Sequence, residues 1–191
     1  MARFRRLRRP KFCVELANML KRFLISAGLL VTLAASLNAY QSGWVKVEPL
    51  GGGFSVMMPA KPDEKVEPPE KFTFHLFTVK GERAIYAASF GDYAPSIKLN
   101  SEGELIADRD NFLKGVNAKL IESRKITLDG HAGLEFTAEN ETASFRGRFY
   151  LLGNRAYQLA VVIFRGQDDS DNVNRFFDSF TFSSNQDHNR P

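Results

Sequence analysis

The sequence predicts an α+β fold in which an antiparallel meander of β-strands is flanked by helices, an α/β/α sandwich. Short segments rich in β-branched and aromatic residues are separated by glycine-containing pairs that are typical of hairpin turns. Two amphipathic segments lie outside these hairpins and indicate helices. The mixed polarity of the central strands favours helices that cover both faces of the sheet at least in part.

The N-terminal part of the chain has the features of an export signal rather than of a folded domain. A basic segment at residues 1–22 is followed by an apolar run at residues 23–39 and then by polar chain. Residues 1–39 contain eight Lys or Arg and one Glu, whereas residues 40–191 contain 18 basic and 21 acidic residues. The net positive charge therefore lies in the signal, and it does not indicate a nucleic-acid-binding domain.

The next two features of this signal are its start position and whether it is cleaved or retained as an anchor. Met19 precedes two basic residues and would start a signal of ordinary length, so we interpret residues 1–18 as an upstream start extension. We expect cleavage and export to the periplasm or the outside of the cell. The apolar run has 17 residues, against roughly 20 needed to span a bilayer. The alternative is therefore an inner-membrane anchor at residues 23–39, which would be the only contact with a membrane.

Residues 40–184 are predicted to form a single domain, and residues 185–191 a frayed tail. The only cysteine, Cys13, lies in the signal. The exported part therefore has neither disulfide bonds nor thiolate chemistry, and its stability must come from its core.

The first part of the domain contains four predicted strands. The segments WVKVEP and FSVMMP alternate in polarity and are separated by a turn at Gly51–Gly53. Residues 63–71 are charged and proline-rich, which predicts a loop. The segments at residues 71–80 and 83–90 then form a hairpin across Gly81–Glu82.

A helix is predicted at residues 101–120. Ser101 and Glu104 have the spacing of a capping box, in which each side chain satisfies a backbone donor of the first turn. Apolar side chains recur at helical spacing at Leu105, Phe112, Val116 and Leu120. This stripe is expected to face a core.

The meander and a second helix complete the domain. The predicted strands are residues 120–128, 134–139, 142–152 and 155–164. Asp129–Gly130 and Gly153–Asn154 suit the positive φ of two-residue hairpin turns. A helix at residues 170–180 begins at Ser170, among aspartates that favour a helix N-terminus. One face of this helix is apolar and carries Val173, Phe176, Phe177 and Phe180.

The order of these motifs resembles the PsbP-like superfamily. The resemblance covers residues 45–182 and rests on FSVMMPAKP, on LDGHAGLEF, on GRFYLLGNRAYQLAVV and on RFFDSFTF, arranged around a hairpin and a capped helix. That superfamily includes the extrinsic PsbP protein of photosystem II, a Ran-binding protein and many exported bacterial proteins, to which this chain is most similar. The resemblance implies an antiparallel sheet between helices and a non-enzymatic accessory or binding role.

The strand segment SFRGRFY contains the best candidate for a binding surface. If Gly153–Asn154 is a two-residue turn, Tyr150 lies opposite Tyr157 and Arg148 lies opposite Leu159. Arg146, Arg148, Tyr150 and Tyr157 would then share one face of the sheet. Such a cationic and aromatic patch can hold a carboxylate or an acidic partner.

The same residues have a purely structural interpretation. If Asn140–Glu141 is also a two-residue turn, Glu135 lies opposite Arg146. The pair would then be a cross-strand ion pair, with the arginine stems packed over the tyrosines.

No other pattern in the chain indicates a reaction or a cofactor. His75, His131 and His188 are isolated in the sequence, and we interpret the aspartates at 168, 169 and 171 as helix caps. No nucleophile elbow, phosphate-binding loop or basic aromatic platform occurs, so we expect no enzyme, no cofactor, no metal and no nucleic-acid partner. Trp44, the only tryptophan, is either part of the core or an interface anchor.

The resulting functional hypothesis is an exported, non-catalytic accessory or binding domain that supports a component of the cell envelope. Its expected partner is an envelope protein, and the domain itself is expected to be a monomer. A periplasmic carrier of a small ligand or a metal is the alternative. An unrecognised hydrolase is the third hypothesis.

Overall fold

The computed structural model describes residues 43–67, 74–94 and 101–183. The predicted export signal, with its alternative as an anchor, and the predicted tail lie outside these residues. Within the described ranges, no helix combines the length and the apolar character needed to cross a membrane.

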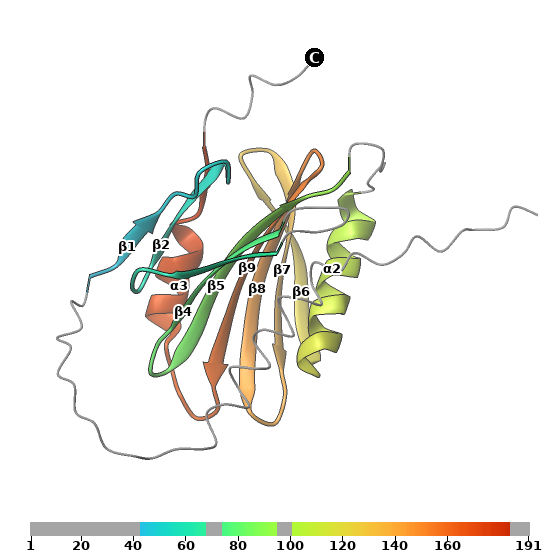
Figure 1. The fold of residues 1–191 in the computed structure, drawn as a ribbon. Helices are drawn as coiled ribbons and strands as arrows, with labels where there is room; N and C mark the ends of the chain where they lie inside the picture. The colour runs from blue at the N-terminus through green and yellow to red at the C-terminus, as the bar shows by residue number, and fades with distance from the viewer. Residues whose placement is uncertain (1–42, 68–73, 95–100, 184–191) are drawn as a thin grey trace, which may run out of the picture.

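A seven-stranded antiparallel sheet forms the centre of the fold (Figure 1). Its spatial order is β3 (Asp63–Glu67), β4 (Phe74–Lys80), β5 (Ala84–Asp92), β9 (Arg155–Phe164), β8 (Ala143–Leu152), β7 (His131–Glu139) and β6 (Lys119–Leu128). Each of the strands from β6 to β9 lies beside the next one in the chain, which is the predicted meander. The predicted α+β class is confirmed.

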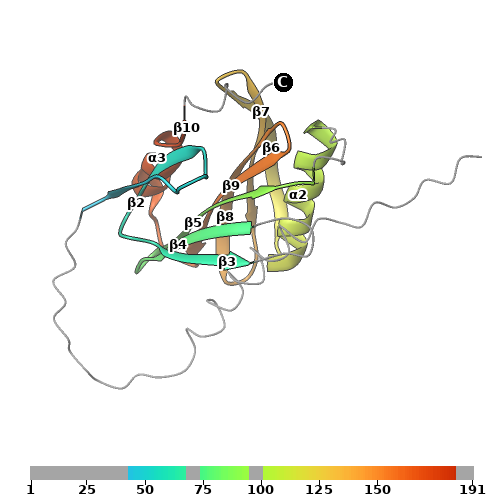
Figure 2. The same cartoon turned by 45° about the horizontal axis from the view of Figure 1, so that its top comes forward.

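Both faces of this sheet are covered, as the polarity of its central strands predicted. Helix α2 (Ser101–Val116) packs on one face. Helix α3 (Ser170–Asp178) packs on the other, together with a three-stranded sheet of β1 (Val45–Val47), β2 (Phe54–Met58) and β10 (Thr181–Phe182). Figures 1 and 2 show α2 and α3 on opposite sides of the large sheet.

Aromatic rings fill the core under α2. Phe112 is fully buried, and its ring centroid lies 5.7 Å from that of Phe136 and 5.9 Å from that of Phe149. Phe136 lies directly over the backbone of Gly147, where an added Cβ would be only 2.3 Å from the ring. The glycine in SFRGRFY therefore provides the space that this ring occupies.

A second aromatic core lies under α3 and the small sheet. Phe54 of β2 packs against Tyr157 and Phe180, with ring centroids 5.8 and 5.4 Å away. Met58 is fully buried, whereas its neighbour Met57 points to the other side of β2 and is partly exposed. The adjacent methionines therefore pack on opposite faces of the strand.

Two predicted turns are confirmed in detail. Asp129 and Gly130 both have positive φ, 51° and 78°, and they join β6 to β7 as a two-residue turn. Gly153 has a φ of 59° and joins β8 to β9 together with Asn154. These backbone angles favour glycine, and an aspartate tolerates them better than most residues do.

Several predicted boundaries were wrong, including the end of the second helix, which lies at Asp178 and not at Phe180. Residues 63–67 form the edge strand β3 and not a loop, because charged side chains are tolerated where one edge of a strand faces water. The first helix ends at Val116, because Asn117 adopts a left-handed φ of 52°, and Leu120 already belongs to β6. The β4–β5 turn is one residue later than predicted, since Gly81 donates its N–H to the carbonyl of Ala84.

The close approach at Gly147 leads to a test of the core under α2. We expect Gly147→Ala to lower the free energy of unfolding by about 1–3 kcal/mol, because the added methyl group must displace the buried Phe136 ring. Urea unfolding measures this change. Gly43→Ala is the matched control, since nothing lies within 4 Å of its Cβ position, and its unfolding should match the wild type. Equal stability of the two variants would contradict the packing described.

Candidate functional site

The four residues that the sequence singled out lie side by side on β8 and β9. Cα pairing places Tyr150 opposite Tyr157 and Arg148 opposite Leu159, as the two-residue turn between the strands predicted. Arg146 lies two residues before Arg148 on the same strand. All four side chains therefore point to the face of the sheet that α3 covers.

The prediction that Glu135 lies opposite Arg146 was wrong, because Glu135 lies opposite Arg148. The cause is the turn between β7 and β8. Asn140 donates its N–H to the carbonyl of Ala143 at 3.0 Å, and its side-chain Oδ1 accepts the N–H of Ala143 at 2.9 Å. The turn therefore begins one residue later than predicted, which moves the opposing strand by two residues.

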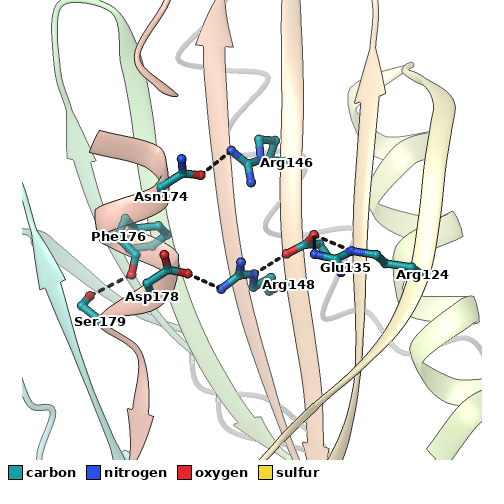
Figure 3. Close-up of polar contacts among 8 residues, drawn as sticks. All are labelled: Arg124, Glu135, Arg146, Arg148, Asn174, Phe176, Asp178 and Ser179. Atoms are coloured by element: carbon teal, nitrogen blue, oxygen red, sulfur yellow. Dashed lines mark hydrogen bonds and ion pairs between the residues drawn. The ribbon is translucent and has the colours of Figure 1, made fainter. Parts of the chain in front are cut away.

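Charged side chains link α3 to three strands of the sheet (Figure 3). Arg148 of β8 donates from Nε to Glu135 of β7 and from Nη1 to Oδ1 of Asp178 of α3, the latter at 3.0 Å. Arg124 of β6 donates from Nη2 to Oε1 of Glu135 at 2.6 Å. The two guanidinium groups and two carboxylates balance each other, and we call these four residues the arginine network.

The arginines also pack against an aromatic ring of α3. The guanidinium carbons of Arg146 and Arg148 lie 5.5 and 5.0 Å from the centroid of Phe177, within the range of cation–π attraction. Arg146 donates from Nη1 to Oδ1 of Asn174 at 3.0 Å. Arg146 thus fixes α3 to β8 at Asn174, and Arg148 fixes it at Asp178, one helical turn later.

The aromatic half of the predicted surface is not exposed. Tyr150 has an exposed fraction of 4% and Tyr157 of 0%. Phe180 stacks on Tyr150 with a centroid distance of 5.5 Å, and Phe182 packs against Tyr157 at 5.2 Å. The segment after α3 returns over the sheet and covers both tyrosines, so the predicted patch is reduced to its arginines.

The electrostatics of the arginine network stabilise the charged forms. Partial burial favours the neutral form of Glu135, but the hydrogen bonds from Arg148 and Arg124 outweigh burial and hold its pKa below the ordinary value of 4.5. Burial similarly opposes the charge of Arg148, whose pKa is nevertheless raised by its bonds to Glu135 and Asp178. The geometry therefore suits a structural clamp between helix and sheet.

His75 and His131, the two histidines in the described ranges, lie on different strands of the sheet. His75 stacks on Phe90 with a centroid distance of 4.5 Å, and His131 packs edge-on against Phe182 at 5.4 Å. His188 lies outside the described residues. Among those that are described, no three His, Cys, Asp or Glu side chains are grouped so that they could hold a metal ion.

The aspartates lie at the start of α3, as predicted, but the side chain of Asp169 at the N-cap position makes no capping hydrogen bond to the helix backbone. Asp168 accepts the N–H of Ser170 at 3.0 Å, and Asp169 occupies the N-cap position. The side chain of Asp169 accepts the hydroxyl of Tyr86, so it also fixes α3 to β5. Trp44 is partly buried against Tyr86, and the guanidinium of Arg175 lies 4.5 Å from its ring centroid.

A clamp on the glycine turn was not predicted from the sequence. Arg155 donates to both carboxylate oxygens of Asp92 at 2.6 Å, and its Nη1 also donates to the carbonyl of Gly51 at 2.6 Å. Its guanidinium carbon lies 5.1 Å from the ring centroid of Phe90. No local pattern indicates this contact, because its partners are far apart in the chain.

The outer edge of β6 is the second feature that the sequence did not single out. β6 ends the sheet, and no described strand pairs with its outer side. Six of its ten side chains are exposed, including Ile121 with an exposed fraction of 57%. Ile121 lies at a bulge, after which the register runs without interruption from Glu122 to Leu128. The signal that predicts such an edge is the density of charged residues in a strand.

Two side chains of helix α2 reach this edge. Glu102 forms an ion pair with Lys125 at 2.8 Å, and Arg109 donates to the hydroxyl of Ser123 at 2.9 Å. Ile106 lies on α2 between these two contacts and has an exposed fraction of 37%. The edge of β6 and one side of α2 therefore form a continuous surface with both charged and apolar side chains.

Comparison with known proteins adds a similarity to solved structures. No family model matches the sequence, and no curated relative matches it either. A solved structure from Bacteroides thetaiotaomicron is similar to this chain at 13% sequence identity and a TM-score of 0.35. The similarity covers 76% of this chain and 50% of that one, so the chain spans about half the length of that structure. The PsbP-like resemblance stays a prediction.

The role of Arg148 as a clamp is tested by removing its charge. We expect Arg148→Met to lower the free energy of unfolding at neutral pH by about 1–2 kcal/mol, because Glu135 and Asp178 both lose a charged donor. Arg124→Met is the matched control and should cost less than about 1 kcal/mol, since Arg124 is 61% exposed. Urea unfolding measures both. A larger effect at Arg124 would show that Arg148 is not the main link.

The lowered pKa of Glu135 leads to a test of pH dependence. The ionised carboxylate stabilises the fold above pH 4.5, and this contribution is lost as the pH falls through the lower pKa of the folded state. The difference in stability between the wild type and Glu135→Gln should therefore be larger at pH 7 than at about pH 3. Urea unfolding at the two pH values measures it. A difference that does not change with pH would contradict the ion pairing.

Proposed function

We propose that this chain is an exported, non-catalytic accessory domain that binds and supports another component of the cell envelope. The observation that carries this proposal is the outer edge of β6, a ten-residue strand that ends the sheet. A sheet edge presents a row of backbone donors and acceptors, and an extended segment of another protein can pair with them.

The arrangement of the charged groups supports a binding role at this edge. The arginine network and the Arg155 clamp hold parts of the same chain together, so their charges already have partners within the fold. The exposed side chains of β6 and of the adjacent side of α2 have fewer such contacts. A partner can therefore bind there without breaking the contacts that hold α3 on the sheet.

The cellular setting comes from the sequence. The basic and apolar residues 1–39 support export, with anchoring by residues 23–39 as the alternative. The order of motifs at residues 45–182 supports membership of the PsbP-like superfamily, whose members include accessory domains. An antiparallel sheet between two helices is the arrangement that this membership implies.

The proposed function is tested by site-specific photo-cross-linking in the cells that make the protein. With Ile121→p-benzoylphenylalanine in the full chain, we expect a cross-linked product with an envelope protein, because this side chain is exposed at the edge of β6. Glu82→p-benzoylphenylalanine is the matched control at the exposed β4–β5 turn, where we expect no such product. The measurement is mass spectrometry of the products.

Each other outcome of this experiment argues against the proposal. Equal yields at both positions would indicate random collision. A product from Glu82 alone would place the binding surface at the opposite side of the sheet. No product at either position, with the chain present in the envelope fraction, would remove the support for a binding role.

A further inference from the structure

The backbone of β6 is suited to accept one more strand. After the bulge at Ile121, seven consecutive residues from Glu122 to Leu128 pair regularly with β7. In an antiparallel pair, alternate residues turn their N–H and C=O groups away from the neighbouring strand. The regular stretch of β6 therefore offers an uninterrupted row of outward donors and acceptors, about 23 Å long at 3.3 Å per residue.

The side chains along this row carry a net positive charge. Lys119, Arg124 and Lys125 are basic, and Glu122 is the only acidic residue of β6. Lys125 is 73% exposed and remains within reach of a partner, whereas Arg124, although 61% exposed, is bonded to Glu135 within the arginine network. The bonds from Arg124 to Glu135 use Nε and Nη2.

The partner of Lys125 does not bury the charge of this side chain. The pair of Lys125 with Glu102 lies in water, where both side chains are more than half exposed, and such pairs contribute little to stability. An acidic side chain on an added strand can therefore approach Lys125 at low cost.

A second copy of this chain fits the edge less well. In a two-fold antiparallel pairing, the register is centred on one residue, which then lies opposite itself. The register that pairs all residues from Glu122 to Leu128 is centred on Lys125. The register shifted by one residue toward the start of β6 is centred on Arg124. Both place like charges directly opposite each other, which destabilises a pair of strands.

From this edge we infer that β6 takes up an extended acidic segment of the partner protein as an eighth strand of the sheet. This inference rests on the proposed function and names the chemistry of the partner at the same surface. Main-chain hydrogen bonds would provide the pairing, and a carboxylate opposite Lys125 would select the segment.

The test uses two fluorescent eight-residue peptides, one of alternating glutamate and valine and one of alternating lysine and valine, with the full chain. We expect the acidic peptide to bind more tightly, as measured by fluorescence anisotropy. Its affinity should fall as salt is added. Hydrogen exchange should slow at residues 119–128 in its complex. Equal binding of both peptides, or slower exchange elsewhere, would overturn the inference.

Charge reversal at the edge provides the matched variants. Lys125→Glu should weaken binding of the acidic peptide about fivefold, because an attractive pair becomes a repulsive one at an exposed site. Lys80→Glu makes the same change at the exposed end of β4, on the other side of the sheet, and should leave binding unchanged. Equal losses in both variants would show that only net charge matters and would overturn the inference. Circular dichroism confirms that both variants are folded.

Two further outcomes separate this inference from the proposed function. If cross-linking at Ile121 captures an envelope protein but the acidic peptide does not bind, the binding role stands and the acidic segment is wrong. If sedimentation equilibrium shows dimers, and exchange at residues 119–128 slows as the protein concentration rises, a second copy is the occupant and the inference is wrong. A monomer that binds the acidic peptide at β6 supports it.

Discussion

The burial of β5 and β9 on both faces is the constraint on which the rest of the structure depends. Side chains of these strands alternate between the two cores, with Ile85 and Val162 under α2 and Tyr86 and Tyr157 under α3. A sheet that is apolar on both sides must be covered on both sides, because exposing either face would leave a large apolar area in water. Helix α2 meets this need on one face, and α3 with the small sheet meets it on the other.

The arginine network follows from this arrangement. Helix α3 is short, at nine residues, so its apolar face has few side chains with which to hold it on the sheet. Arg146 and Arg148 fix its open side through Asn174, Asp178 and the ring of Phe177. The sequence predicted a binding surface at these two arginines, but in the structure they interact with side chains of α3 and β7. Unused backbone groups lie at the ends of the sheet, where β6 is the longer of the two edge strands.

The sequence was sufficient for features that depend on short-range patterns. Asp129–Gly130 and Gly153–Asn154 predicted their turns, and the second of these correctly placed Tyr150 opposite Tyr157. It was not sufficient where a single side chain shifts a boundary, as Asn140 does by bonding to Ala143 and moving Glu135 opposite Arg148. It also could not show that Tyr150 and Tyr157 are buried, because their cover comes from a segment about 30 residues later in the chain.

The openness of the β6 edge is the central claim, and residue-resolved amide hydrogen exchange of the isolated chain tests it most directly. Amides in β5 and β9 should exchange slowest, since these strands are paired and covered on all sides. Along β6, we expect slow exchange at the amides that bond to β7 and fast exchange at the alternate amides that face outward. Uniform slow exchange along β6 in the monomer would show that this edge is already covered, and it would contradict the claim.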